Sequence, residues 1–469
     1  MLFPSKEFLF IFLPIVLLVY YGLLRKNMTL KNIFLLAVSL FFYAFGEPVY
    51  IWLMVSVIIL NYIFGLLVSR VRGSRKKSYL VLALMVLANL GILGYFKYYR
   101  FVMLQINRFA HTSFFVPEIL LPIGISFFTF QAMSYVFDVY RGKGNVQKNP
   151  LKVGLYIALF PQLIAGPIVR YETIADQIDN RKETRASFVN GTSRFVTGLI
   201  KKVIIANNVA RVADGAFEFI NVTGYHGSVA LAWLGALAYT LQIYFDFSAY
   251  SDMAIGLGKM FGFEFEENFN YPYIAHNITD FWRRWHISMQ TWFRDYLYIP
   301  LGGSRVSFPR LILNMFIVWL CTGIWHGANW TYLAWGLFNF VLLLFERLTG
   351  FSGKKAWWTR LYTLVLILIS MVIFRSTGLG NAKNYIFAMF GIGACAIIDS
   401  AFLAFIKAFW IYILLAVIAS TPIVPWLSKR YNGRRAYDIA YAAVTLILLF
   451  ISLTFIFGNA YSPFIYFNF

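Results

Sequence analysis

Apolar residues along this chain gather in long runs that short polar gaps separate. Runs such as Tyr50–Val68, Val229–Phe247 and Ile439–Phe457 approach the length of about 20 residues that a helix needs to cross a bilayer core. Shorter runs suit helices that are tilted, paired across a short break, or re-entrant. The pattern predicts an all-α integral membrane protein with about eleven transmembrane helices. Because no internal repeat or linker is visible, one domain over residues 1–469 is predicted.

Two irregularities are expected within this pattern. Pro161 and the pair Gly166-Pro167 interrupt the run Val153–Val169. This predicts a re-entrant segment, because non-helical backbone survives in a membrane only where protein surrounds it. The segments Ser187–Val212 and Ile278–Leu297 mix apolar residues with arginine and lysine. They predict amphipathic helices that lie parallel to the membrane or line the protein interior.

Composition and charge agree with a membrane protein. Hydrophobic residues make up 60% of the chain and charged residues 13%, whereas soluble proteins carry about 25% charged residues. The net charge of +21 comes from basic residues in the short gaps, such as Arg25-Lys26 and Arg70–Lys77. This placement suits anionic lipid headgroups rather than nucleic acid, and it predicts that both termini face away from the cytoplasm. The first run, Phe8–Leu24, is predicted to be a retained span rather than a cleaved signal peptide.

His326 is the clearest candidate for chemistry. It follows the apolar run Ile312–Trp325, where a desolvated imidazole stays neutral and can accept a proton. Gly323 and Gly327 allow a substrate or another helix to approach, and they predict an open, loosely packed surround. Asn329 shares a face with His326 if the helix continues, and could donate to a developing oxyanion. The alternative is a core histidine bonded to a neighbouring helix, and the residues alone favour neither interpretation.

His286 is the second candidate, in the motif Asn277–Met289. A helix that Asn277 or Thr279 caps would place Trp282, His286, Met289 and Phe293 on one face. The functional interpretation is a second polar group in a substrate passage. The structural interpretation is a histidine that holds a horizontal helix, and a supporting role is favoured over direct catalysis.

Three further residues carry weaker signals. Asp246 and Asp252 flank a polar break at the end of a span, but they are six residues apart with no third ligand nearby. They favour helix capping and pairing with arginines over a metal or acid–base site. Cys321 lies five residues before His326, on a different helical face, which argues against a Cys–His nucleophile pair. No metal site and no permanently bound cofactor are predicted, and serine-hydrolase and nucleotide-binding motifs are absent.

Several of these stretches together resemble the membrane-bound O-acyltransferases, and most closely their alginate O-acetyltransferase branch. The principal stretches are Tyr244–Gly256, Asp280–Ser288, Thr291–Gly303 and Trp325–Asn329. Supporting stretches are Leu93–Tyr98, Leu121–Phe127, Asp138–Gly142, Leu163–Pro167 and the ending Ser462–Phe469. The resemblance runs from the N-terminus to about Gly350 and resumes at the tail.

The resemblance implies a fold, a reaction and residue roles. The family fold is a ring of tilted helices around a thin centre, with a passage from both faces. The family's membrane histidine corresponds to His326, and its second histidine to His286. Members move an acyl group from a cytoplasmic thioester to a hydroxyl without requiring a metal. The resemblance also places the chain in a bacterial inner membrane.

The function expected from residues and resemblance is O-acetyl transfer to an exported polysaccharide, directly or through an extracytoplasmic partner protein. Acetyl-CoA is the expected donor, which the basic side chains of Lys201, Lys202, Arg283 and Arg284 could attract. D-alanyl or other acyl transfer to a cell-wall polymer is an alternative. A transporter of a sugar or lipid intermediate is another, but transporters often show two similar halves, and none are visible here. The polysaccharide itself is left open.

Overall fold

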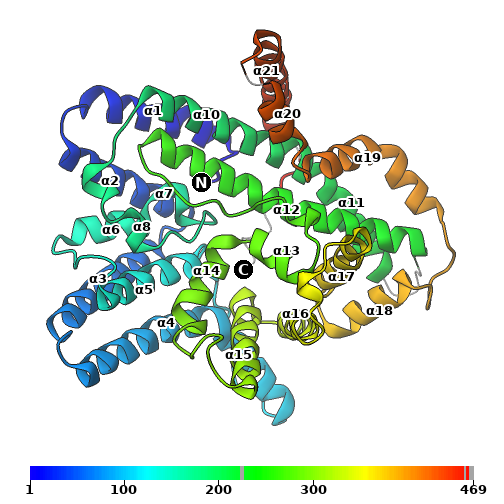
Figure 1. The fold of residues 1–469 in the computed structure, drawn as a ribbon, viewed down its shortest axis with the longest axis horizontal. Coiled ribbons are helices and arrows are strands. Elements are labelled where there is room, and N and C mark those ends of the chain that lie inside the picture. Colours follow the sequence, from blue (N-terminus) through cyan, green and yellow to red (C-terminus); the bar gives the residue numbers. More distant parts are fainter. Residues whose placement is uncertain (222–226, 432, 459–460, 464–469) are drawn as a thin grey trace. The chain divides into compact units, whose positions relative to one another are not determined.

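The computed structural model describes residues 1–221, 227–431, 433–458 and 461–463 (Figure 1). The described residues form helices and loops and contain no strand. They divide into two compact units. The first holds residues 1–195 and 250–267, and the second holds residues 196–249 and most of the chain after 268. The single domain over residues 1–469 stays a prediction.

The first unit is built from the N-terminal helices. Its first helix spans residues 8–23, with α1 (Leu13–Leu18) between two π-helical stretches. The helices that follow are α2 (Met28–Gly46), α3 (Ile51–Arg70), α4 (Arg75–Phe109), α5 (Ile125–Arg141), α6 (Pro150–Ala158), α7 (Phe160–Leu163), α8 (Tyr171–Ile174), α9 (Gln177–Asn180) and α10 (Arg185–Ile200), whose last residues belong to the second unit.

The interrupted run Val153–Val169 is broken as its prolines and glycine predicted. Helix α6 ends at Ala158, α7 is a single turn that contains Pro161, and residues 164–170 are not helical. Every residue from 153 to 169 is nevertheless buried. Buried, irregular backbone of this kind needs protein around it, because lipid offers it no hydrogen bonds. Its re-entrant placement in the membrane stays a prediction.

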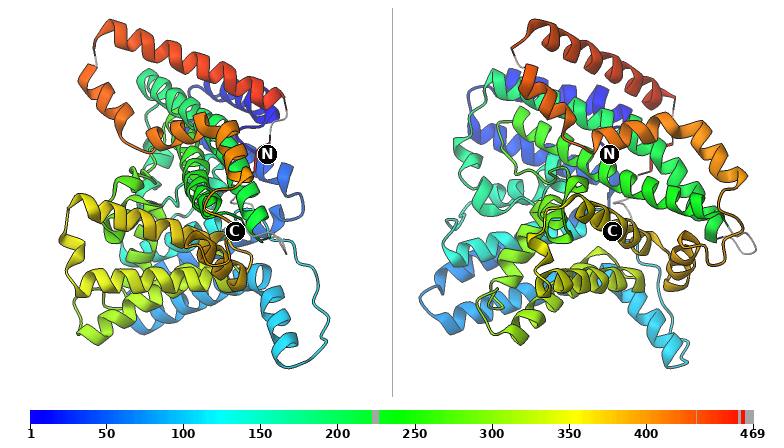
Figure 2. Two further views of the ribbon diagram at one scale, coloured as in Figure 1. Left: turned by 90° about the vertical axis from the view of Figure 1, so that its right-hand side faces the viewer. Right: turned by 45° about the vertical axis from the view of Figure 1, so that its right-hand side comes forward.

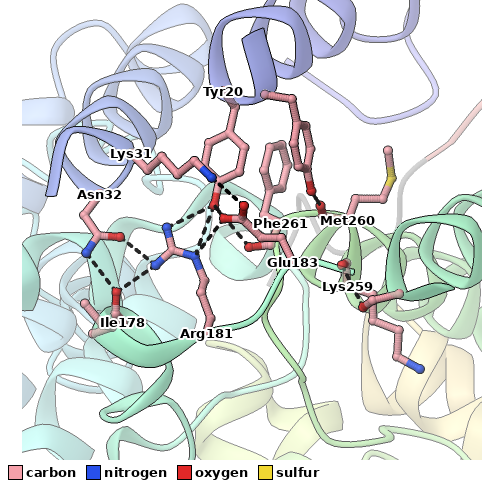
Figure 3. Close-up of polar contacts among 11 residues, drawn as sticks. Tyr20, Lys31, Asn32, Ile178, Arg181, Glu183, Lys259, Met260 and Phe261 are labelled. Carbon is pink, nitrogen blue, oxygen red and sulfur yellow. Dashed lines mark hydrogen bonds and ion pairs between the residues drawn. The ribbon is translucent and has the colours of Figure 1, made fainter. Parts of the chain in front are cut away.

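A network of charged side chains stabilises the first unit (Figure 3). The Arg181 guanidinium donates to the Asn32 side chain and to the Ile178 carbonyl oxygen, both at 2.7 Å. It also donates to the Tyr20 hydroxyl at 3.1 Å, which in turn donates to Glu183 at 2.5 Å. Lys31 forms an ion pair with the same Glu183 carboxylate. The network therefore ties the first helix, α2 and the loop before α10 to one another.

The second unit holds the remaining helices. They are α11 (Asn207–Asn221), α12 (Val229–Met260), α13 (Ile278–Arg284), α14 (Ile287–Phe293), α15 (Phe308–His326), α16 (Trp330–Leu348), α17 (Trp357–Arg375), α18 (Leu379–Met389), α19 (Ser400–Ala419), α20 (Ile423–Tyr431) and α21 (Arg435–Phe457). The end of α12 belongs to the first unit. Figure 2 shows α21 as the last, red helix, and Ser452 is its one buried residue among those described.

Nine described helices are long and apolar enough to cross a membrane, so the expected count of about eleven is not confirmed. Helix bounds and apolar runs do not always coincide. The apolar stretch 385–405 is divided, since α18 ends at Met389 and α19 begins at Ser400, where the Asp399 side chain caps it. The apolar stretch 79–95 lies within the longer, 35-residue helix α4.

The amphipathic segment Ser187–Val212 is helical along its whole length. It covers most of α10, a π-helical stretch over Lys201–Ala206 and the start of α11. Its apolar residues supply buried side chains such as Val203, Val209 and Val212. The predicted orientation parallel to the membrane stays a prediction.

Candidate functional site

Helices α15 and α16 pack closely (Figure 1), and His326 is the last residue of α15. A Cβ atom on Gly323 would lie 2.6 Å from the Tyr332 carbonyl oxygen. A Cβ atom on Gly336 would lie 2.6 Å from the Trp319 carbonyl oxygen. Glycine at these positions therefore lets the two helix backbones touch.

The predicted loose surround of His326 was wrong. The space beside Gly327 is filled by the Tyr332 ring, which would lie 2.4 Å from an added Cβ atom. Only 5% of His326 is exposed. Gly323 and Gly327 leave room for the neighbouring helix and for the Tyr332 ring, not for open space. Close approach of another helix was the second possibility that the sequence raised.

Aromatic rings enclose the His326 imidazole. Its ring centroid lies 4.9 Å from those of Trp325 and Trp335 and 5.0 Å from that of Phe374. All three contacts are edge-on. They come from α15, α16 and α17, so three helices fix the orientation of the imidazole.

His286 lies in a break between α13 and α14, which the sequence did not predict. Its φ of +46° and ψ of +54° are left-handed values that end one helix and start the next. The single helical face expected for Trp282, His286, Met289 and Phe293 is therefore interrupted. On the far side of the break, the Ile287 amide donates to the Asn268 carbonyl oxygen at 2.9 Å. Non-glycine residues adopt this conformation rarely, and then mostly where the surrounding structure imposes it.

The His286 side chain is fully buried. Its ring centroid lies 4.6 Å from that of Phe247 on α12 and 5.9 Å from that of Trp325. His286 lies outside the helices that could span a membrane. Burial lowers its pKa to about 3, because an apolar environment disfavours the charged imidazolium. The imidazole is therefore neutral at physiological pH.

Trp325 joins the two histidines, since its ring contacts both imidazoles. The structure thus brings together the two residues that the sequence proposed separately, although 40 positions divide them in the chain (326 − 286). Because burial lowers the pKa of His286 to about 3, His326 rather than His286 is the candidate for proton transfer at this site.

Hydrogen bonds between side chains attach α13 to α16. The Trp282 indole donates to the Asn339 side-chain oxygen at 3.2 Å. The Asn339 amide donates in turn to the Ser370 hydroxyl of α17 at 3.0 Å. Trp282 also packs edge-on against Trp335, with ring centroids 5.5 Å apart. The element that precedes His286 is therefore held by the helix that contacts His326.

The proposed role of Asn329 assumed that the helix of His326 continues through it, but the helix ends before Asn329. Helix α15 ends at His326, and Asn329 is the N-cap of α16. Its side-chain oxygen accepts from the Thr331 amide at 3.1 Å, and its side-chain nitrogen donates to the Thr377 carbonyl oxygen at 3.0 Å. The residue lies three positions from His326, but its amide already has a structural role.

The four basic residues proposed for donor binding lie in different surroundings. Lys202 is buried and forms an ion pair with Asp246 at 2.5 Å. Lys201 is half-buried, and Arg283 is exposed. Arg284 forms an ion pair with Asp280 at 2.8 Å.

The two aspartates of α12 form ion pairs rather than a shared site. Asp252 pairs with Arg194 at 2.6 Å, as predicted, whereas the partner of Asp246 is a lysine rather than an arginine. Both lie inside α12, so neither caps it. Cys321 and Cys395 are free thiols. The described part of the chain holds no group of three His, Cys, Asp or Glu side chains that could bind a metal ion.

Sequence reasoning missed the residues that build the enclosure. Trp325, Trp335, Phe374 and Phe247 come from four helices, and an apolar run gives no sign of which aromatic faces a histidine. One available signal was the presence of Gly323 and Gly336, because small residues in apolar helices often lie where two helices touch.

Comparisons with known proteins show what this chain is similar to. A family model of the membrane-bound O-acyltransferases matches residues 147–377, which include both histidines. The chain is 40% identical to "Probable alginate O-acetylase AlgI" of Pseudomonas putida, over 100% of both proteins. It is 34% identical to "Peptidoglycan O-acetyltransferase" of Helicobacter pylori, over 100% of this chain and 98% of that protein. It is 28% identical to "Teichoic acid D-alanyltransferase" of Bacillus subtilis, over 52% of this chain and 65% of that protein.

Proposed function

This chain belongs to the membrane-bound O-acyltransferase family, and on that basis we propose that it transfers acetyl groups to hydroxyls of an exported polysaccharide. It is a multi-pass membrane O-acyltransferase with nine helices, among the described residues, that could span a bilayer. The contact of Trp325 with both His286 and His326 carries the proposal, because it places two imidazoles in one enclosure.

In the proposed reaction His326 is the general base. It takes the proton of an acceptor hydroxyl while the hydroxyl oxygen attacks the thioester carbonyl carbon. The new C–O bond gives a tetrahedral oxyanion, and its collapse breaks the C–S bond. The proton returns to the leaving thiolate. The Asn329 amide has a second N–H besides the one bonded to Thr377, and this N–H is the candidate donor to the oxyanion.

We propose acetyl-CoA as the donor. The full-length similarity to two O-acetylating enzymes favours an acetyl group over D-alanine, since the D-alanyltransferase matches about half of this chain. Arg283 and Lys201 are the proposed contacts for the donor phosphates, because their side chains reach the protein surface more than that of Lys202. Arg284 and Lys202 would contribute through the electrostatic field around them.

The proposed location is a bacterial inner membrane, with both termini on the extracytoplasmic side and an extracytoplasmic partner that completes the transfer. Basic loops such as Arg70–Lys77 support this orientation. Cysteine substitution and labelling with a membrane-impermeant reagent test it at Ser5 and at Asn468, which lies outside the described residues. Labelling of either position only after the inner membrane is permeabilised would contradict the orientation.

The function is tested with purified protein in liposomes that receive acetyl-CoA labelled in the acetyl group. Thiol release and appearance of label in an acceptor oligosaccharide are measured, with His326→Gln as the control. The expected result is label transfer by the wild type alone. Uptake of a sugar or lipid intermediate without thioester cleavage would establish a transporter. Transfer only from a D-alanyl thioester would establish the alternative acyl group.

A further inference from the structure

A buried carboxylate on α16 has no role in the reaction proposed above. Glu346 is in the last turn of α16, and none of its surface is exposed. One oxygen accepts from the Ile278 amide at 2.6 Å, and the other accepts from the Thr279 amide at 2.9 Å. The second oxygen also accepts from the Thr279 hydroxyl at 2.7 Å. Three donors therefore hold the carboxylate in one orientation.

These donors are the first residues of α13. The first amides of a helix have no partner within it, and Glu346 satisfies two of them. Asn277 satisfies a third, because its side chain accepts from the Asp280 amide at 2.7 Å. Helix α13 has seven residues and is followed directly by the break at His286. Its N-terminus is therefore less than three turns from the histidine.

Helix α16 thus holds α13 at two points. Glu346 holds its start, and Asn339 holds its middle through the Trp282 indole. The same helix carries Trp335, whose ring packs against His326. Helix α16 therefore positions both histidines, and Glu346 is the charged residue through which it holds the start of α13. Burial of an ionisable group in a membrane protein is costly, so such a group points to a function.

We propose that Glu346 is a positioning residue, which fixes α13 so that the His286 imidazole stays against Trp325 beside His326. The inference rests on the proposed acyl transfer, because it assigns Glu346 a part in that reaction. Glu346 does not touch the reacting groups; it acts through α13 and His286. A displacement of a supporting group by about 1 Å is enough to lower a rate by about 100-fold.

The substitution Glu346→Gln tests the proposal with a minimal change of shape. The amide keeps one acceptor for the Ile278 amide, but it places N–H groups against the Thr279 amide, which then loses its acceptor. We expect kcat for acetyl transfer to fall about tenfold, with the KM for acetyl-CoA nearly unchanged. Thr279→Val should lower kcat less, and Thr279→Ser, which keeps the hydroxyl, should restore it.

A double-mutant cycle separates positioning from general stability. Glu346→Gln is measured in the wild type and in His286→Asn, with the amount of folded protein determined by size-exclusion chromatography in detergent. If Glu346 acts through His286, it should have almost no further effect once the imidazole is gone. The matched control is Glu172→Gln, a half-buried carboxylate of the first unit that pairs with Arg170 at 2.8 Å. Its effect should be the same factor in both backgrounds.

The outcomes are distinguishable. An equal loss from Glu346→Gln in both backgrounds would show a structural role only and overturn the proposal, as would wild-type kcat in the single variant. A fall in kcat that vanishes in the His286→Asn background would support it. If the wild type transfers no acetyl group at all, the proposed function fails. The wild type is therefore measured first, before any variant is compared with it.

Discussion

The two units of this protein bury ionisable side chains in contrasting ways. In the first unit, Lys31 and Arg181 face Glu183 across an ion pair and a shared tyrosine hydroxyl (Figure 3). In the second unit, His286 and His326 are packed against aromatic rings. The first arrangement compensates charge with charge. The second surrounds the imidazoles with aromatic rings, and for His286 this burial lowers the pKa and favours the neutral form.

The difference separates structural from chemical reasons for burying a titratable group. Glu183, Lys31 and Arg181 join distant segments of the chain, and their mutual contacts explain their burial. Ring contacts orient the two imidazoles, but a phenylalanine would pack against the same rings. What the imidazole of His326 adds is a nitrogen that can accept and return a proton in the proposed reaction. The comparison therefore predicts loss of activity at one region and loss of stability at the other.

The largest effect is expected at His326. His326→Gln keeps a polar side chain of similar volume but removes the basic nitrogen. Transfer should fall by about 10²–10⁴-fold, as expected when a general base is lost, and His326→Ala should be no worse. The acetyl content of the secreted glycan measures the effect, with the membrane level of the variant checked by blot. Near-normal acetylation at wild-type protein levels would return His326 to a structural role.

The next effect is on stability, in the charged network of the first unit. Glu183→Gln leaves the Lys31 charge buried without its partner, and breaking a buried ion pair typically costs about 3–5 kcal/mol. The thermal transition in detergent should fall, while the activity per folded molecule stays at the wild-type value. The double variant Lys31→Met/Glu183→Gln should recover part of the loss. Unchanged stability in the single variant would remove the contrast between the two regions.

A smaller effect is expected at His286, where two substitutions distinguish backbone from side chain. The residue has a φ of +46°, which asparagine tolerates better than alanine does. If His286 mainly supports the site, His286→Asn should keep measurable transfer, about one tenth of wild type. His286→Ala should be weaker and less stable. If both variants fold but abolish transfer as completely as His326→Gln does, then His286 takes part directly in the reaction.

Some features of the site followed from local sequence. His326 stands out because it ends an apolar run, where any ionisable residue is conspicuous, and His286 stands out within the motif Asn277–Met289. The helix break at Pro161 and Gly166 followed from backbone chemistry. The break at His286 did not, because no proline or glycine marks it, and a left-handed histidine is imposed by its neighbours. Glu346 was visible only as the next charge after a long apolar run, with nothing to show which helix it would hold.

The sequence by itself determined that this chain is helical, that it belongs in a membrane and which two histidines to suspect, since these depend on hydropathy and residue type along the chain. Only the tertiary structure decided what surrounds the histidines. Trp325 contacts both imidazoles, and α16 holds α13 through Asn339 and Glu346. Trp325 and His286 are 39 positions apart in the chain (325 − 286), and Glu346 and Ile278 are 68 positions apart (346 − 278). Helical periodicity specifies faces within one helix, and the pairing of faces between helices depends on packing that no local pattern encodes.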